Sequence, residues 1–347
     1  MKNFTIHLFI CFSALILISA CTQKKGDDNQ NLSEMEAQAK SDIFVVVDSS
    51  LFNIVNPDAS LEKLTEGFEW SEGPVWVSEF NSILFSDVPT NQVYKWNDEE
   101  GLSKYLNPSG YTGEVERGGE MGSNGLTLNN DGQLVLCQHG DRQVALMDAP
   151  LDAPEPNFKP LADNWEGKRF NSPNDVCFAS NGNMYFTDPP YGLVKNMNDS
   201  SKEIHFQGVY LVKPGTNEAI LVVDSLTRPN GIALTPDESQ IIVANSDPDK
   251  IHWYIFDVNE DGTLTNGQIY FDGKGYGEKY SGLPDGLKID SNGNVFATGP
   301  GGIWIFNSQG DHLGIILTGH PTANCAFGPD EKTLYITADM HLMRLKM

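Results

Sequence analysis

The stretch Glu72-Gly73-Pro74-Val75-Trp76 is the first of six copies of one pattern, in which a polar residue, usually beside glycine or proline, precedes an apolar run. The copies begin at Glu72, Asn124, Asn174, Asn230, Asp285 and Asn324. The first five follow one another at intervals of 50 to 56 residues, and the sixth comes 39 residues after the fifth. A unit of about 50 residues that repeats in this way is typical of a β-propeller blade.

Each copy is followed by a turn and then by two further apolar runs. In the third copy, the turn Asn181-Gly182 precedes Met184-Tyr185-Phe186, and Val209-Tyr210-Leu211 comes later. The alternation of short apolar runs and turns indicates strands that pair in sequence order within one sheet. The pattern therefore predicts an all-β, six-bladed β-propeller with a central channel over residues 43–347.

The two ends of the chain are expected to share the last blade. Only 23 residues follow Asn324, which is too few for a whole repeat, and residues 43–71 add 29 more. The outer strand of the last blade should then come from residues 43–47 or from the stretch near residues 61–64. Joining both ends in one blade would leave no open sheet edge between the first and last blades.

The composition describes a globular chain that is strongly acidic. Its 347 residues include 23 Lys and Arg against 47 Asp and Glu, a formal net charge of −24. Nucleic acid is excluded as a main partner because phosphate backbones are bound by clusters of Lys and Arg. The 33 glycines and 19 prolines fit many short strands joined by tight turns, and they exclude coiled coils, helical bundles and polytopic membrane proteins.

The first 42 residues form a separate region. Residues 1–20 combine a short basic start with an apolar run too short for a comfortable membrane span, as in a signal peptide. The run ends in Ile18-Ser19-Ala20-Cys21, which resembles a bacterial lipobox, so Cys21 is expected to carry a lipid; a plain cleaved signal is the alternative. Residues 21–42 are polar and are expected to be a flexible tether. The sequence thus predicts an exported protein, anchored at the bacterial cell envelope only through its lipid.

The polar residues that begin the six repeats are candidates for a metal site. In a propeller the innermost strands line the channel, so residues at equivalent positions on them converge on one axis. The six comprise two carboxylates and four amides, and an all-oxygen set without Cys or His suits a hard cation such as Ca²⁺. The alternative is that each is a turn residue, because Asn-Gly and Asp-Gly are common tight-turn dipeptides.

Several separated motifs resemble the gluconolactonase/regucalcin (senescence marker protein) family. They are Glu72-Gly73-Pro74-Val75-Trp76, Arg169-Phe170-Asn171-Ser172-Pro173-Asn174-Asp175, Pro229-Asn230-Gly231 and Pro284-Asp285-Gly286, within a resemblance that spans roughly residues 50–347. It implies a six-bladed propeller that holds a divalent metal, usually calcium, and hydrolyses sugar lactones. Carried over position by position, it implies that the metal ligands are Glu72, Asn174, Asn230 and Asp285.

One position departs from the family pattern. In regucalcin-like members an arginine two residues before the equivalent of Asn174 contacts the sugar, and here that position is Ser172. Arg169, five residues before Asn174, is a candidate for reaching the same space. The sugar preference of those members therefore does not transfer to this chain.

Candidate roles follow from the chemistry of lactone hydrolysis, which needs a polarised carbonyl, an activated water and a proton acceptor. Asp285 is the candidate general base; in the alternatives it is only a ligand, or Glu72 exchanges roles with it. Candidate substrate contacts are Asn124, His139, Arg169, Asp188 and His320. The two histidines could titrate near neutral pH at the mouth of the channel.

The sequence thus favours an exported, Ca²⁺-dependent hydrolase that opens a small-molecule lactone. One alternative is a phosphotriesterase-like hydrolase using the same site, because diisopropyl fluorophosphatase is a structural cousin of the family. Another is a non-catalytic propeller in which calcium has a structural role and the rim binds a glycan or a protein, since fold alone does not determine function.

Overall fold

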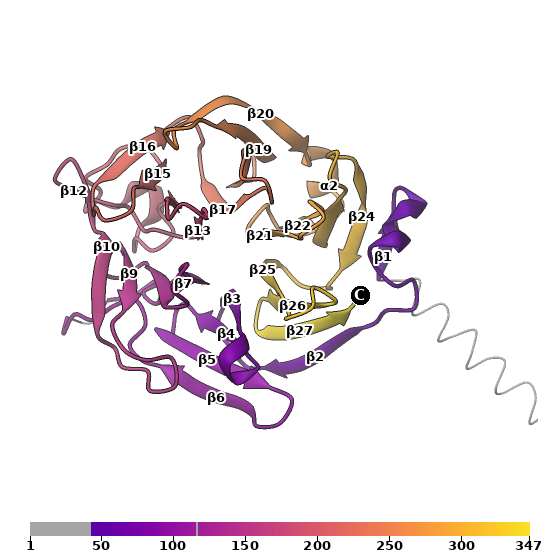
Figure 1. The fold of residues 1–347 in the computed structure, drawn as a ribbon, viewed down its shortest axis with the longest axis horizontal. Helices are drawn as coiled ribbons and strands as arrows, with labels where there is room; N and C mark the ends of the chain where they lie inside the picture. The colour runs from indigo at the N-terminus through magenta and orange to yellow at the C-terminus, as the bar shows by residue number, and fades with distance from the viewer. Residues whose placement is uncertain (1–42, 116) are drawn as a thin grey trace, which may run out of the picture. The chain divides into compact units, whose positions relative to one another are not determined.

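The computed structural model describes residues 43–115 and 117–347. Six antiparallel sheets form a ring around a central channel, and each sheet runs outward from the channel (Figure 1). Within each sheet, strands that follow one another in sequence are hydrogen-bonded neighbours, as the repeated strand–turn–strand pattern requires. The predicted all-β, six-bladed propeller is therefore confirmed.

The blades are numbered in chain order, from the channel outward. Blade 1 contains β3 (Ser71–Val77), β4 (Ser82–Asp87), β5 (Gln92–Asn97) and β6 (Gly101–Leu106). Blade 2 contains β7 (Ser123–Leu128), β8 (Leu134–Gln138), β9 (Gln143–Met147) and β10 (Phe158–Ala162). Blade 3 contains β13 (Val176–Phe178), β14 (Met184–Asp188), β15 (Gly208–Val212) and β16 (Ala219–Val223).

The remaining blades follow the same plan. Blade 4 contains β17 (Pro229–Leu234), β18 (Gln240–Asp247), β19 (Lys250–Val258) and β20 (Leu264–Asp272). Blade 5 contains β21 (Leu287–Ile289), β22 (Val295–Gly299), β23 (Gly302–Phe306), β24 (His312–Leu317) and β1 (Phe44–Val46). Blade 6 contains β25 (Thr322–Phe327), β26 (Thr333–Ala338), β27 (His341–Lys346) and β2 (Leu61–Glu66). The connections hold a hairpin of β11 (Asn164–Trp165) and β12 (Lys168–Arg169) and the short helices η1 (Ser49–Asn53), η2 (Ser78–Phe80), η3 (Asn196–Asn198) and α2 (Lys274–Gly277).

The ring closes in blade 6, where an N-terminal strand joins three C-terminal strands. Strand β2 pairs antiparallel with β27, with Leu61 opposite Leu345. Of the two candidates for the closing strand, the stretch near residues 61–64 therefore takes this position. The run at residues 43–47 instead supplies β1, which adds a fifth strand to blade 5 by pairing with β24. Both N-terminal strands cover sheet edges that would otherwise present unpaired backbone groups.

Apolar side chains fill the space between neighbouring blades. Between blades 4 and 5, for example, the rings of Trp253 and Trp304 are both fully buried, with centroids 5.0 Å apart. Within the described ranges, no helix is long and apolar enough to cross a membrane. The predicted signal peptide (residues 1–20), the lipidation site Cys21 and the tether (residues 21–42) lie outside the described residues.

The glycines that follow the polar residues of four repeats allow close packing around the channel. A Cβ atom added to Gly231 would lie 2.2 Å from the carbonyl oxygen of Asp285, and one added to Gly286 would lie 1.9 Å from Cγ of Asn324. Gly73 and Gly125 approach the next blade in the same way. These glycines touch neighbouring inner strands, so the polar-residue–glycine pairs are not hairpin turns here.

We expect Gly231→Ala to destabilise the fold. The new methyl group would overlap the Asp285 carbonyl, and the backbone shift that relieves such an overlap typically costs about 1–3 kcal/mol. The free energy of unfolding, measured with denaturant, should fall by that amount. Gly275→Ala is the matched control, because a Cβ atom there meets nothing within 4 Å. Equal stability of the two variants would contradict the packing argument.

Candidate active site

A cavity of about 240 Å³ opens at the channel, and its walls contain polar residues from five of the six repeats. These residues are Glu72, Asn124, Asn174, Asn230 and Asp285. Glu72, Asn124 and Asn230 lie near the starts of the inner strands β3, β7 and β17, whereas Asn174 and Asp285 lie just before β13 and β21. Residues more than 200 positions apart thus meet because every inner strand starts beside the same axis.

Three oxygen atoms at this cavity are candidates for binding a cation. The side-chain Oδ1 atoms of Asn124, Asn174 and Asp285 are buried, and none has a hydrogen-bond partner within residues 43–115 and 117–347. A buried polar atom without a partner is costly, so such atoms usually indicate a bound ion, water or ligand. The donor set therefore fits a hard, oxygen-binding cation.

Hydrogen bonds orient two further candidate ligands. Asn230 donates from its amide nitrogen to the Ser246 hydroxyl at 2.9 Å, which leaves its amide oxygen as the acceptor. The Ser246 hydroxyl in turn donates to the carbonyl of Pro284, directly before Asp285. Glu72 accepts the Gly73 N–H at 2.6 Å on Oε2, so its other carboxylate oxygen is left for a different partner. Ser246 thus connects the Asn230 side chain with the backbone next to Asp285.

The cavity concentrates buried negative charge. Burial, reinforced by the nearby Asp175 carboxylate, raises the pKa of Glu72 to about 7. Burial and then repulsion from Glu72 and Glu120 hold the pKa of Asp285 well above its ordinary value, although Asp285 keeps some exposure to the cavity. A cation would relieve this repulsion, because opposite charge stabilises the ionised form of a carboxylate.

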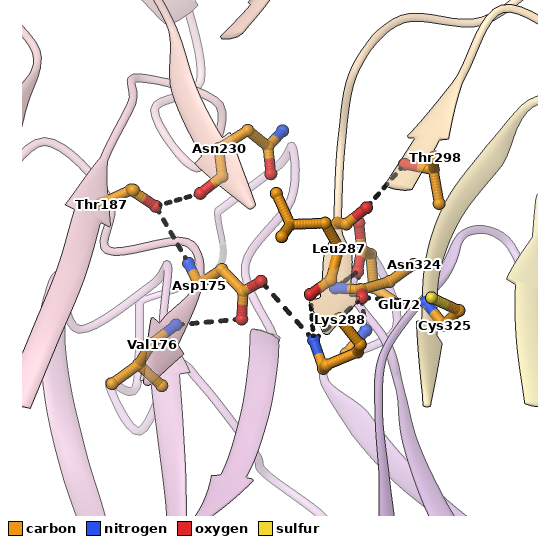
Figure 2. Close-up of polar contacts among 12 residues, drawn as sticks. Glu72, Asp175, Val176, Thr187, Asn230, Leu287, Lys288, Thr298, Asn324 and Cys325 are labelled. Carbon is orange, nitrogen blue, oxygen red and sulfur yellow. Dashed lines mark hydrogen bonds and ion pairs between the residues drawn. The ribbon is translucent and has the colours of Figure 1, made fainter. Parts of the chain in front are cut away.

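Lys288 places one positive charge in the channel beside this site (Figure 2). Its Nζ lies 4.0 Å from Oδ2 of Asp175 and donates to Oδ1 of Asn324 at 3.3 Å. Asn324 donates from its amide nitrogen to Oε2 of Glu72 at 3.3 Å. Burial raises the pKa of Asp175, and the Lys288 ammonium opposes that rise. Asp175, Lys288 and Asn324 thus form a chain of polar contacts that ends on Glu72.

Three of the other predicted substrate contacts lie outside the cavity wall. Asp188 is fully buried and accepts the backbone N–H groups of Asn171 and Ser172 at 2.8 and 2.7 Å, so it holds the segment before Asn174. Arg169 is exposed and donates to the carbonyl of Asp141 at 3.1 Å. His320 packs its ring 4.2 Å from that of His341, measured between centroids.

His139 and Ser172 are buried behind the wall. The His139 ring is fully buried, with Nδ1 3.5 Å from Oε2 of Glu120, which does line the cavity. The Ser172 hydroxyl donates to the Pro189 carbonyl at 2.6 Å, so it is used within the protein. It also accepts the Gly192 N–H at 2.9 Å, and the Arg117 guanidinium donates to the carbonyl of the same Gly192.

Sequence reasoning missed several residues of the cavity wall, among them Glu120, Tyr191 and Ser246. Glu120 and Tyr191 lie in connections outside the repeated pattern, in residues 107–122 and 189–207. Ser246 lies on β18, a second strand, where the repeat predicts only apolar packing. Of these three, only Tyr191 could have been found from the sequence, because it lies three residues after Asp188, which was already a candidate substrate contact.

A protein-family model matches most of the chain. The sequence model of the SMP-30/gluconolactonase/LRE-like region matches residues 70–339. The chain belongs to this family. The resemblance predicted from the separated motifs is therefore confirmed.

Relatives of the SMP-30/gluconolactonase family match most of the chain. This chain is 38% identical over 304 residues to the gluconolactonase of Zymomonas mobilis subsp. mobilis, and the match covers 84% of this chain and 83% of that protein. A solved gluconolactonase structure from Xanthomonas campestris superposes with a TM-score of 0.74 at 28% identity, over 87% of this chain and 94% of the other. The calcium-binding protein regucalcin from Agrobacterium tumefaciens shares the fold, with a TM-score of 0.63 at 15% identity over 82% of this chain and 93% of the other.

We expect Lys288→Met to destabilise this SMP-30/gluconolactonase family chain at about pH 8. The change removes the ammonium and leaves Asp175 buried without its counter-charge. Breaking a buried pair costs several kcal/mol, but Lys288 is 29% exposed, so about 1–3 kcal/mol is expected. Denaturant unfolding would measure the loss, with the exposed Lys104→Met as control. Adding Asp175→Asn should recover part of the stability, and the ion-pair argument fails if it recovers none.

Proposed function

We propose that this chain is a metal-dependent lactone hydrolase of the gluconolactonase type, with a divalent cation, calcium, held by Glu72, Asn174, Asn230 and Asp285. The observation that carries the proposal is the convergence of these four side chains on one cavity, where two oxygens lack partners among the described residues. The 38% identity to a gluconolactonase over most of the chain supports the reaction type. The calcium-binding relative of the same fold supports the choice of ion.

The cavity residues suit the hydrolysis of a cyclic ester. A bound divalent cation would polarise the carbonyl and acidify a water molecule. Asp285 is the proposed base, because it is partly exposed to the cavity and a carboxylate has a second oxygen besides the one that would bind the cation. It accepts a proton from the attacking water while the water oxygen bonds to the carbonyl carbon. The ring C–O bond then breaks, and the departing ring oxygen takes the proton held by Asp285 to become a hydroxyl group, which regenerates the carboxylate.

The proposal includes the location of the activity. The apolar run of residues 1–20 and the lipobox-like Ile18-Ser19-Ala20-Cys21 support export and a lipid anchor on Cys21. Substrate would then be a lactone present in the envelope of the cell. Labelling of the expressed protein with a radioactive fatty acid, and its loss in Cys21→Ser, would test the anchor.

We expect lactone hydrolysis to be lost on chelation and restored by calcium. Hydrolysis by the full chain would be followed by pH-stat on a panel of sugar and acyl lactones, as purified, after EDTA and after Ca²⁺ is returned. Organophosphate esters belong in the same panel, because activity on these alone would favour a phosphotriesterase. A calcium-stabilised fold that hydrolyses nothing on the panel would favour a binding module.

A second prediction separates the two roles of Asp285. Asp285→Asn keeps an oxygen that can bind a cation but removes the proton acceptor, so hydrolysis should fall about 10²–10⁴-fold. Calcium should still bind, more weakly, as measured by isothermal titration calorimetry. The exposed Asp224→Asn is the control for the chemical change. Full hydrolysis by Asp285→Asn at saturating calcium would make this residue a ligand only.

Calcium binding should weaken as the pH falls below about 7. In the metal-free protein the pKa of Glu72 is raised to about 7 and that of Asp285 is also raised, so protons occupy these carboxyl groups at lower pH. A cation must displace those protons, and its affinity therefore increases as the pH rises through this range. Titration calorimetry in buffers of different ionisation enthalpy should detect proton release at about pH 6 and little at about pH 9. The same release at both values would contradict the pKa argument.

A further inference from the structure

A buried histidine stands directly behind one wall of the cavity. The His139 side chain is fully buried, and neither ring nitrogen has a hydrogen-bond partner in residues 43–115 or 117–347. The Oε2 atom of Glu120 lies 3.5 Å from Nδ1 of His139. The Glu120 side chain is 36% exposed and lines the cavity that contains Asp285. The pair therefore joins a fixed ring inside the protein to a carboxylate at the cavity surface.

Backbone hydrogen bonds hold the two residues in register. The N–H of His139 donates to the Gly122 carbonyl at 3.1 Å, and the N–H of Gly140 donates to the Met121 carbonyl at 3.1 Å. The segment that carries Glu120 is thus paired with the segment that carries His139. The backbone directly after Glu120 is therefore tied to the segment of His139.

Two further contacts fix the surroundings of the pair. The Arg117 guanidinium donates to the carbonyls of Gly140, at 2.9 Å, and Gly192. Gly192 leaves room for the ring, because a Cβ atom at that position would lie 2.5 Å from Cβ of His139. The segments that carry Arg117, His139 and Gly192 thus pack together around the histidine ring.

We propose that Glu120, positioned by His139, determines specificity by accepting hydrogen bonds from the hydroxyl groups of a polyhydroxylated lactone. This inference rests on the proposed function. An ionised carboxylate is an acceptor with two oxygens and suits neighbouring hydroxyl groups. The Ser172 hydroxyl is used within the protein, whereas Glu120 is a charged side chain on the cavity wall that is available to substrate hydroxyl groups. His139 acts through Glu120 and is a positioning residue.

The physical basis of the discrimination is the cost of an unpaired polar group. A site built to bond a substrate hydroxyl discriminates against an analogue without it, because the protein group is then left without its partner. The contact is partly exposed, so an effect of about 10–100-fold is expected rather than the much larger factors of fully buried sites. The effect should fall on substrate binding, since the hydroxyl groups do not react.

The test compares two lactones of the same ring size, D-glucono-δ-lactone and the unsubstituted δ-valerolactone. Glu120→Ala in the full chain should lower kcat/KM for the hydroxylated lactone about 10–100-fold through KM, and change δ-valerolactone less than about twofold. Glu120→Gln keeps one acceptor and should be intermediate. His139→Leu should shift the same ratio in the same direction. Glu114→Gln, on the same connection and exposed, is the control.

Two measurements keep the outcomes distinct. Because the Glu120 carboxylate repels Asp285, Glu120→Ala should change calcium affinity only slightly, whereas a loss as large as that in Asp285→Asn would make Glu120 a metal ligand and overturn the proposal. Equal losses on both lactones, or none, would also overturn it. If the wild-type chain hydrolyses neither lactone, the proposed function fails on its own. In that case, binding of the non-hydrolysable 1,5-anhydro-D-glucitol tests hydroxyl recognition separately. It should be weakened at least about fivefold in Glu120→Ala if Glu120 accepts hydrogen bonds from hydroxyl groups, and unchanged binding would overturn the proposal.

Discussion

The close approach of the inner strands around the channel is the constraint on which the rest of this structure depends. Gly231 and Gly286 touch the next inner strand so tightly that a single methyl group would not fit. Because each strand lies against its neighbour, the polar residue in front of each glycine is carried to the axis. The candidate site is therefore a consequence of packing between blades, and a change in that packing would move Asn230 and Asp285 together.

Bringing acidic residues to one axis creates an electrostatic cost that the protein must balance. Glu72, Asp175 and Asp285 are all surrounded by protein, and burial raises the pKa of each. Lys288 supplies one permanent cation on the Asp175 side of the cluster. The proposed divalent ion would supply the remaining positive charge, beside Glu72 and Asp285. The Lys288 ammonium is already engaged within the protein, because it donates to Asn324 and lies 4.0 Å from Asp175 (Figure 2). The Oδ1 atoms of Asn124, Asn174 and Asp285 remain without a hydrogen-bond partner among the described residues.

The connections between blades contribute residues of the cavity wall that the repeats do not supply. Glu120 and Tyr191 lie in long segments that differ from one repeat to the next, and both reach the wall of the cavity. The repeats supply the proposed cation ligands, whereas the connections contribute Glu120 and Tyr191 to the cavity wall. His139 shows the difference, because its position after β8 is repeated but its contact with Glu120 comes from an unrepeated segment.

The sequence by itself determined the fold class, the number of blades and five of the residues that meet at the cavity, since a repeat of about 50 residues places equivalent positions on equivalent strands. It could not decide which N-terminal stretch closes the ring, because both candidates are apolar enough to be strands; only tertiary pairing gave β2 to blade 6 and β1 to blade 5. It also could not show that Asp188 supports a backbone segment, or that Glu120 faces the cavity. Those roles depend on contacts between segments distant in sequence, and no local pattern encodes them.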